Sequence, residues 1–115
     1  MYWLLMVIFL GVDVYLSSAL AGPLHVAAYK GNVEQANRLI LEGANINGKD
    51  HESFAPLHLA ATQGHNDVAD LLINKGAKID LKERDGATPL YLAVLYNKTQ
   101  VAKLLITKGA NCQEE

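Results

Sequence analysis

The apolar and polar positions of this 115-residue chain follow a pattern that returns every 33 residues over residues 22–112. A proline, a leucine and a ring-bearing side chain come together three times, at Pro23, Pro56 and Pro89. An alanine lies four positions after each proline. A period of a few tens of residues predicts a solenoid, in which copies of one short unit stack and bury a shared core.

Each repeat is predicted to begin with a short helix at its proline, because the first helical position needs no backbone N–H. Thr88 precedes Pro89 and is expected to cap the third of these helices through its hydroxyl. Gly22 and Ala55 hold the same position in the other units, and an alanine there weakens a helix start by about 0.5–2 kcal/mol. The residues predicted to end these helices in a left-handed turn are Gly31, Gly64 and Asn97.

A second helix in each unit is predicted from apolar residues spaced three and four positions apart, as in Val68, Leu71 and Leu72. A glycine ends it, and a short polar segment that suits a β-turn finger follows. We therefore predict an all-α solenoid of helix-turn-helix units with short β-turn fingers. Its domain covers residues 22–115, with repeats at about 22–54, 55–87 and 88–115.

These segments resemble the ankyrin repeat. Residues 55–61 correspond to the family's Thr-Pro-Leu-His-x-Ala-Ala, and residues 64–65, 71–73 and 76–80 correspond to its Gly-His, Leu-Leu-Leu and Gly-Ala-Asp-x-Asn segments. The positions that depart from the family pattern are Ser53, Tyr91, Asn97 and Lys98. The resemblance implies a non-enzymatic module that binds a partner protein through its concave face and finger tips.

The resemblance also implies which residues form that surface, namely the fingers and the outward positions of the first helices. These residues are Tyr29, Lys30, His51, Glu52, Phe54, Thr62, Gln63, Arg84, Asp85, Leu95 and Tyr96. Several are large and apolar without an evident core role, and exposed apolar patches mark binding surfaces. Alternatively, Phe54 and Leu95 shield the base of a finger, and the charged residues only solvate the tips.

Composition excludes several classes of function. The formal net charge is −2, from 10 basic and 12 acidic residues, which gives no basic face of the kind that binds nucleic acid. Cys112 is the only cysteine, so neither an intrachain disulfide nor a cysteine metal cluster can form. We find no catalytic, cofactor-binding or metal-binding motif. The resemblance implies that His25 and His58 tie helix starts to nearby backbone groups rather than bind a metal.

The first 21 residues are strongly apolar and lack lysine and arginine. An apolar core followed by Ala19-Leu20-Ala21 is typical of a signal peptide cleaved after Ala21, which predicts export to the periplasm or the exterior. The segment also fits a membrane anchor held by residues 1–16, although Asp13 interrupts its apolar run. As a degenerate earlier repeat it would instead leave the protein cytoplasmic.

The repeat ends raise the question of self-association. Stacked repeats expose apolar sides unless a polar outer face caps them, and residues 90–96 of the last unit are almost entirely apolar. We therefore expect marginal stability in isolation, with self-association or a partner protein covering the ends.

Overall fold

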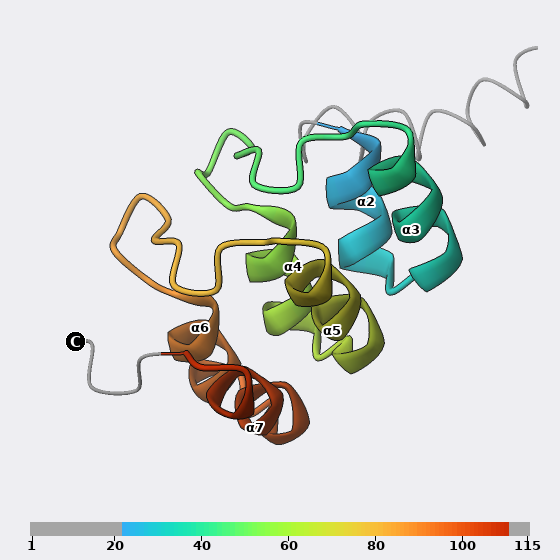
Figure 1. Ribbon diagram of the computed structural model, residues 1–115. Coiled ribbons are helices and arrows are strands. Elements are labelled where there is room, and N and C mark those ends of the chain that lie inside the picture. Colours follow the sequence, from blue (N-terminus) through green and yellow to red (C-terminus); the bar gives the residue numbers. More distant parts are fainter. Residues whose placement is uncertain (1–21, 111–115) are drawn as a thin grey trace, which may run out of the picture.

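The computed structural model describes residues 22–110, and these residues form six α-helices and no strand (Figure 1). The helices are α2 (Pro23–Lys30), α3 (Val33–Leu41), α4 (Pro56–Gln63), α5 (Asn66–Asn74), α6 (Pro89–Leu95) and α7 (Thr99–Thr107). They stack as three helix-turn-helix units, with α4 packed between α2 and α6, and α5 between α3 and α7. The predicted all-α solenoid of helix-turn-helix units is confirmed.

Two fingers follow α3 and α5 and extend on the same side of the stack (Figure 1). The predictions for the signal peptide, the anchor and the degenerate repeat all concern residues 1–21, which lie outside the described residues, as does Cys112. Within residues 22–110, no helix combines the length and the apolar character needed to cross a membrane.

The residue before each proline is the N-cap of the first helix of its unit, and it determines how that helix start is capped. Thr88 accepts a hydrogen bond from the backbone N–H of Tyr91 at 3.1 Å, as predicted. Gly22 makes no side-chain cap. At Ala55, the Nδ1 atom of His58 accepts the backbone N–H of the alanine itself, at 3.0 Å. The motif histidine thus satisfies a donor at a helix start that lacks a capping hydroxyl.

The turns between paired helices use left-handed backbone at the predicted positions, with φ values of 79° at Gly31, 75° at Gly64 and 64° at Asn97. His65 packs directly over the first of these turns, and its Nε2 atom lies 2.9 Å from the carbonyl oxygen of Tyr29. The side chain of Lys98 covers Gly64 in the same way. The first two turns are therefore each covered by a side chain of the next unit.

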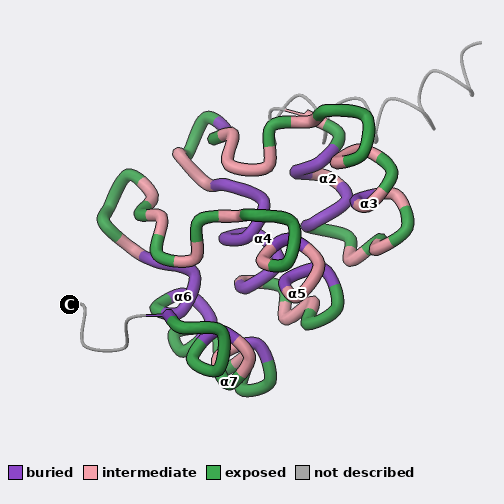
Figure 2. Tube along the Cα trace, viewed as in Figure 1, coloured by how far each residue is buried: buried purple, intermediate pink, exposed green. Residues whose placement is uncertain are grey.

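A continuous apolar core runs through the stack between the first and second helices. Its fully buried members include Ala36, Val68, Leu72, Val101 and Leu105. Figure 2 shows the consequence for the central unit, where α4 is mostly buried while most finger residues are exposed or partly exposed. The helices supply a rigid support from which the fingers project.

The two ends of the stack differ in polarity. Gln35 and Arg38 stand 33 residues before Val68 and Leu71, and the Arg38 guanidinium donates a hydrogen bond to the Gln35 side chain. Val68 is fully buried, whereas Gln35 is only partly buried at the same position of unit one. In unit two, part of the burial of Val68 therefore comes from packing against unit one. The described residues contain no unit before unit one, and unit one has polar side chains at these positions.

Unit three is apolar on the opposite side. Ala28 and Ala61 are fully buried, but Val94 at the equivalent position is 62% exposed. Tyr91, which replaces the motif histidine, is 55% exposed. These positions are covered in units one and two by the unit that follows, so the outer side of α6 presents apolar groups to solvent.

Candidate protein-binding surface

Each finger is held in shape by a carboxylate near its base. In the first finger, Asp50 is buried and its Oδ1 atom accepts the backbone N–H groups of Glu52 and Phe54, at 2.8 and 2.9 Å. In the second finger, Glu83 takes the same part and its Oε1 atom accepts the backbone N–H groups of Asp85 and Ala87. Both fingers are thus closed turns in which one carboxylate satisfies two backbone donors.

The two fingers are also joined to each other. Arg84 donates a hydrogen bond to the carbonyl oxygen of His51, and its guanidinium lies 3.9 Å from the carboxylate of Glu52. The Lys49 ammonium donates to the carbonyl oxygen of Lys82 at 3.0 Å. Much of the charge at the finger tips therefore connects one finger to the next.

The imidazole rings anchor the finger bases to the helices behind them. The Nε2 atom of His25 lies 3.0 Å from the carbonyl oxygen of Phe54, and that of His58 lies 3.2 Å from the carbonyl oxygen of Ala87. Because Nδ1 of His58 accepts an N–H from Ala55, its Nε2 carries the proton and donates. Burial lowers the pKa of His58 and outweighs the backbone carbonyl contacts that would raise it.

The inner sides of the first helices form two rows with a spacing of 33 residues. The rows are Tyr29, Thr62 and Leu95, and Lys30, Gln63 and Tyr96. The hydroxyl of Thr62 donates back to the carbonyl oxygen of Leu59 at 2.9 Å, and the Gln63 amide lies 3.4 Å from that hydroxyl. The middle of each row is thus polar. The more exposed of the large apolar side chains, Leu95 and Tyr96, lie in unit three, and Tyr29 of unit one is 38% exposed.

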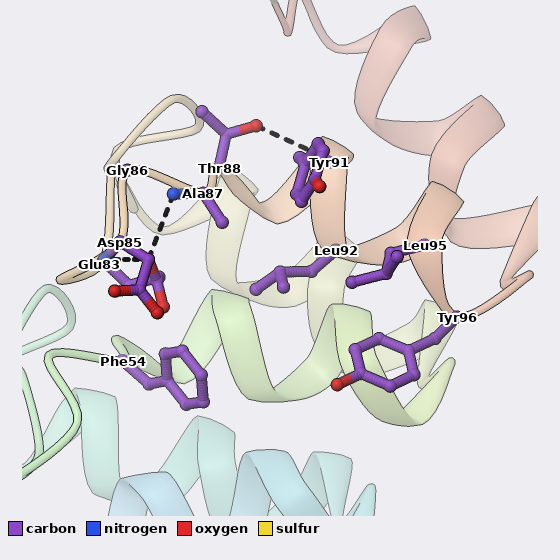
Figure 3. A pocket seen from close by; sticks show the side chains of 10 residues that line it. All are labelled: Phe54, Glu83, Asp85, Gly86, Ala87, Thr88, Tyr91, Leu92, Leu95 and Tyr96. Atoms are coloured by element: carbon purple, nitrogen blue, oxygen red, sulfur yellow. Dashed lines mark hydrogen bonds between the residues drawn. The ribbon is translucent and has the colours of Figure 1, made fainter. Parts of the chain in front are cut away.

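A hollow of about 490 Å³ lies between the second finger and α6, and we call it the α6 hollow. Its lining residues are Phe54, Glu83, Asp85, Gly86, Ala87, Thr88, Tyr91, Leu92, Leu95 and Tyr96. In Figure 3 the side chains of Phe54, Leu92, Leu95 and Tyr96 surround one space, and the finger carboxylates lie at its edge. Leu95 is 58% exposed and Tyr96 is 53% exposed, so this apolar surface is open to a partner.

Phe54 joins the hollow to the core. It is partly buried against the core cluster, and its ring stacks on His58 with ring centroids 5.8 Å apart. The expectation that Phe54 has no core role is therefore wrong, because its ring packs on the core cluster and on His58 at the start of α4. Leu95 is different, since more than half of it is exposed and it is not part of the core cluster.

The structure brings together only some of the residues named from the sequence. Phe54, Asp85, Leu95 and Tyr96 line the α6 hollow. The others lie outside its lining: Tyr29, Lys30, His51, Glu52, Thr62, Gln63 and Arg84. Three of these, His51, Glu52 and Arg84, form the contact between the fingers.

Sequence reasoning missed the contribution of Glu83, Tyr91 and Leu92 to the hollow. One signal was available, because Tyr91 replaces the histidine found at the same position of the other units. Within residues 22–110, no group of three or more His, Cys, Asp or Glu side chains could hold a metal ion.

Stacked helix-turn-helix units with projecting fingers define a helical repeat solenoid. The family model described as ankyrin repeats, in three copies, matches residues 24–115, and the chain belongs to the ankyrin repeat family. Ankyrin repeats are general protein–protein interaction modules, and the family is typically non-enzymatic. No curated protein matches the chain.

Proposed function

We propose that this protein is a non-enzymatic binding module whose partner protein docks on the concave side, in the α6 hollow and along the adjoining finger. The open apolar surface of Leu95 and Tyr96 carries the proposal. These side chains stand beside a finger in which Glu83 already accepts the N–H groups of Asp85 and Ala87, so the finger needs no ligand to hold its shape. A preorganised site loses little conformational entropy on binding.

The composition of the hollow supports a protein partner. Its wall combines aromatic rings and leucines, and aromatic side chains are over-represented among the residues that dominate binding energies. Its volume of about 490 Å³ accommodates one or two side chains of a docked segment. The carboxylates of Glu83 and Asp85 form a polar edge beside this apolar centre.

Peptide selection tests the proposal without a known partner. Random decapeptides displayed on phage are selected against the full chain, and the peptides obtained are titrated against Leu95→Glu and Tyr96→Ala. We expect each substitution to weaken binding about thirtyfold or more, as for a central interface residue. Leu41→Glu is the matched control, because Leu41 is 71% exposed on α3 and lies outside the hollow. Peptides that bind Leu95→Glu as tightly as the unaltered chain contradict the proposed surface.

A second proposal concerns where the module acts. The signal-like residues 1–21 support export, and retention of residues 1–16 would instead make the protein a membrane-anchored accessory that organises others. Mass spectrometry of the mature protein separates these proposals. A first residue of Gly22 supports cleavage and export, and an intact apolar segment in the membrane fraction supports the anchor.

We also propose that two copies associate through the outer side of α6. Val94 occupies the position of the fully buried Ala28 and Ala61. Its larger side chain would prevent another helix from packing on α6 as closely as α2, α4 and α6 pack on one another. Unit one offers the polar Gln35 and Arg38 at the other end. Two unit-three ends therefore match in polarity, and like surfaces form a closed two-fold dimer.

Sedimentation velocity over a range of concentrations tests this association. The full chain is expected to form dimers, Val94→Glu to remain monomeric, and the control Leu41→Glu to dimerise. A monomer at the highest soluble concentration, or dimers of Val94→Glu, would count against the proposal.

A further inference from the structure

The charged side chains that line the α6 hollow are all acidic. Among residues 22–110, its lining contains the carboxylates of Glu83 and Asp85 and no lysine, arginine or histidine. Arg84, which lies between these two residues in the sequence, is directed to the first finger, where it contacts the carbonyl oxygen of His51 and the carboxylate of Glu52. An apolar space that has two carboxylates and no basic side chain in its lining favours a ligand that carries both apolar surface and positive charge.

The two carboxylates do different things. Glu83 accepts the N–H groups of Asp85 and Ala87 and so holds the finger closed. The carboxylate of Asp85 is exposed and has no hydrogen-bond or ion-pair partner among residues 22–110. Asp85 therefore adds nothing visible to the structure of its finger, while it places a negative charge at the edge of the hollow.

The rings of the hollow add to the same preference. Tyr91 on α6 and Tyr96 at its C-terminal cap line the hollow, and both are more than half exposed. The faces of aromatic rings attract lysine and arginine head groups. The aliphatic stems of these side chains also pack well on apolar surfaces while their charged ends remain in water.

We propose that the partner of the α6 hollow is a protein segment with an apolar side chain next to a lysine or arginine, the apolar group filling the hollow and the cation pairing with Asp85. This inference rests on the proposed function and adds the chemistry of the partner to it. An acidic segment does not fit, because its charge would meet Glu83 and Asp85 without a cation to compensate. The proposal concerns selectivity, since an exposed ion pair adds only a small factor to affinity.

The selected phage pools provide the test. Pools selected on the full chain are expected to contain lysine or arginine beside leucine, isoleucine or phenylalanine about threefold more often than pools selected on Asp85→Asn. Glu42→Gln is the matched control, since it removes the same charge from an exposed position at the end of α3. Its pool should keep the basic preference.

Synthetic peptides from the pools supply a second measurement. Replacing the basic residue by glutamine should weaken binding to the full chain about threefold, and this effect should disappear for Asp85→Asn. It should also shrink when ionic strength rises from about 0.05 to about 0.5 M.

The possible results separate the two proposals. The charge preference is overturned if the Asp85→Asn pool contains as many basic residues as the pool from the full chain, or if acidic segments are selected. The proposed surface still stands in that case, provided that binding depends on Leu95. A library that yields no peptide whose binding depends on Leu95 overturns both.

Discussion

The Nε2 atom of His58 donates to the carbonyl oxygen of Ala87, 3.2 Å away, and so fastens the base of the second finger to the start of α4. The opposite ring nitrogen accepts the N–H of Ala55, which leaves no place for a second proton. One neutral imidazole thus joins a helix start and the finger that borders the α6 hollow.

This arrangement predicts a loss of stability in mild acid. Burial lowers the pKa of His58 below its ordinary value of 6.5, so the unfolded chain takes up a proton that the folded chain resists. The free energy of unfolding should therefore fall as the pH drops below about 6.5 and level off once the folded state is also protonated. Urea unfolding at about pH 7.5 and about pH 5.5 measures the effect.

The matched variants isolate the contribution of this ring. His58→Gln should be less stable at neutral pH, and its stability should depend less on pH over the same interval. His51→Gln, which alters an exposed residue at the finger tip, should keep the pH dependence of the unaltered chain. Equal pH dependence in all three proteins would contradict the assignment.

The first finger carries avoidable strain at its turn. Ser53 has a φ of 67°, whereas Gly86 occupies the equivalent position of the second finger with a φ of 86°. A left-handed backbone conformation destabilises a residue with a side chain by about 1–2 kcal/mol. Glycine avoids this strain, but it loses more conformational entropy on folding, which offsets part of the gain. Ser53→Gly should raise the free energy of unfolding by up to about 1 kcal/mol, and Gly86→Ser should lower it by about the same amount. Urea unfolding curves in which both substitutions shift stability in the same direction would refute this reading.

The turn at Gly31 is predicted to be sensitive for a second reason. A Cβ atom added there would lie 2.5 Å from Nδ1 of His65, whereas one added at Gly43 would meet no atom within 4 Å. Both glycines have positive φ, so alanine at either costs about 1–2 kcal/mol in backbone strain. Gly31→Ala should lower the free energy of unfolding by a further ~1–3 kcal/mol, because the imidazole of His65 must move.

A double-mutant cycle measures the second effect by itself. In a His65→Ala background the additional cost of Gly31→Ala over Gly43→Ala should disappear. If the additional cost persists without the imidazole, the clash is not its source.

Much of the fold was predictable because its determinants are local. Proline at a helix start, the hydroxyl of Thr88 and the turn residues Gly31, Gly64 and Asn97 act within a few positions of themselves. Repetition strengthened each of these signals, since the same feature returns in the same register. The helical boundaries followed from them.

The binding surface was less predictable because it depends on contacts between units. Arg84 reads as an ordinary fingertip charge, yet it contacts the preceding finger through His51 and Glu52. Phe54 reads as a free aromatic, yet it stacks on His58. Nothing local to Glu83 indicates that its carboxylate closes the finger, because the accepting geometry exists only once the turn has folded.

The central claim is that a partner segment occupies the α6 hollow, and nuclear magnetic resonance tests it most directly. A selected peptide is titrated into the isotope-labelled full chain, and shifts of the backbone amide signals are followed. The largest shifts should fall on Phe54, Ala87, Leu95 and Tyr96, which border the hollow, and should vanish for Leu95→Glu. Shifts confined to the outer faces of α5 and α7, with these four amides unmoved, would contradict the account.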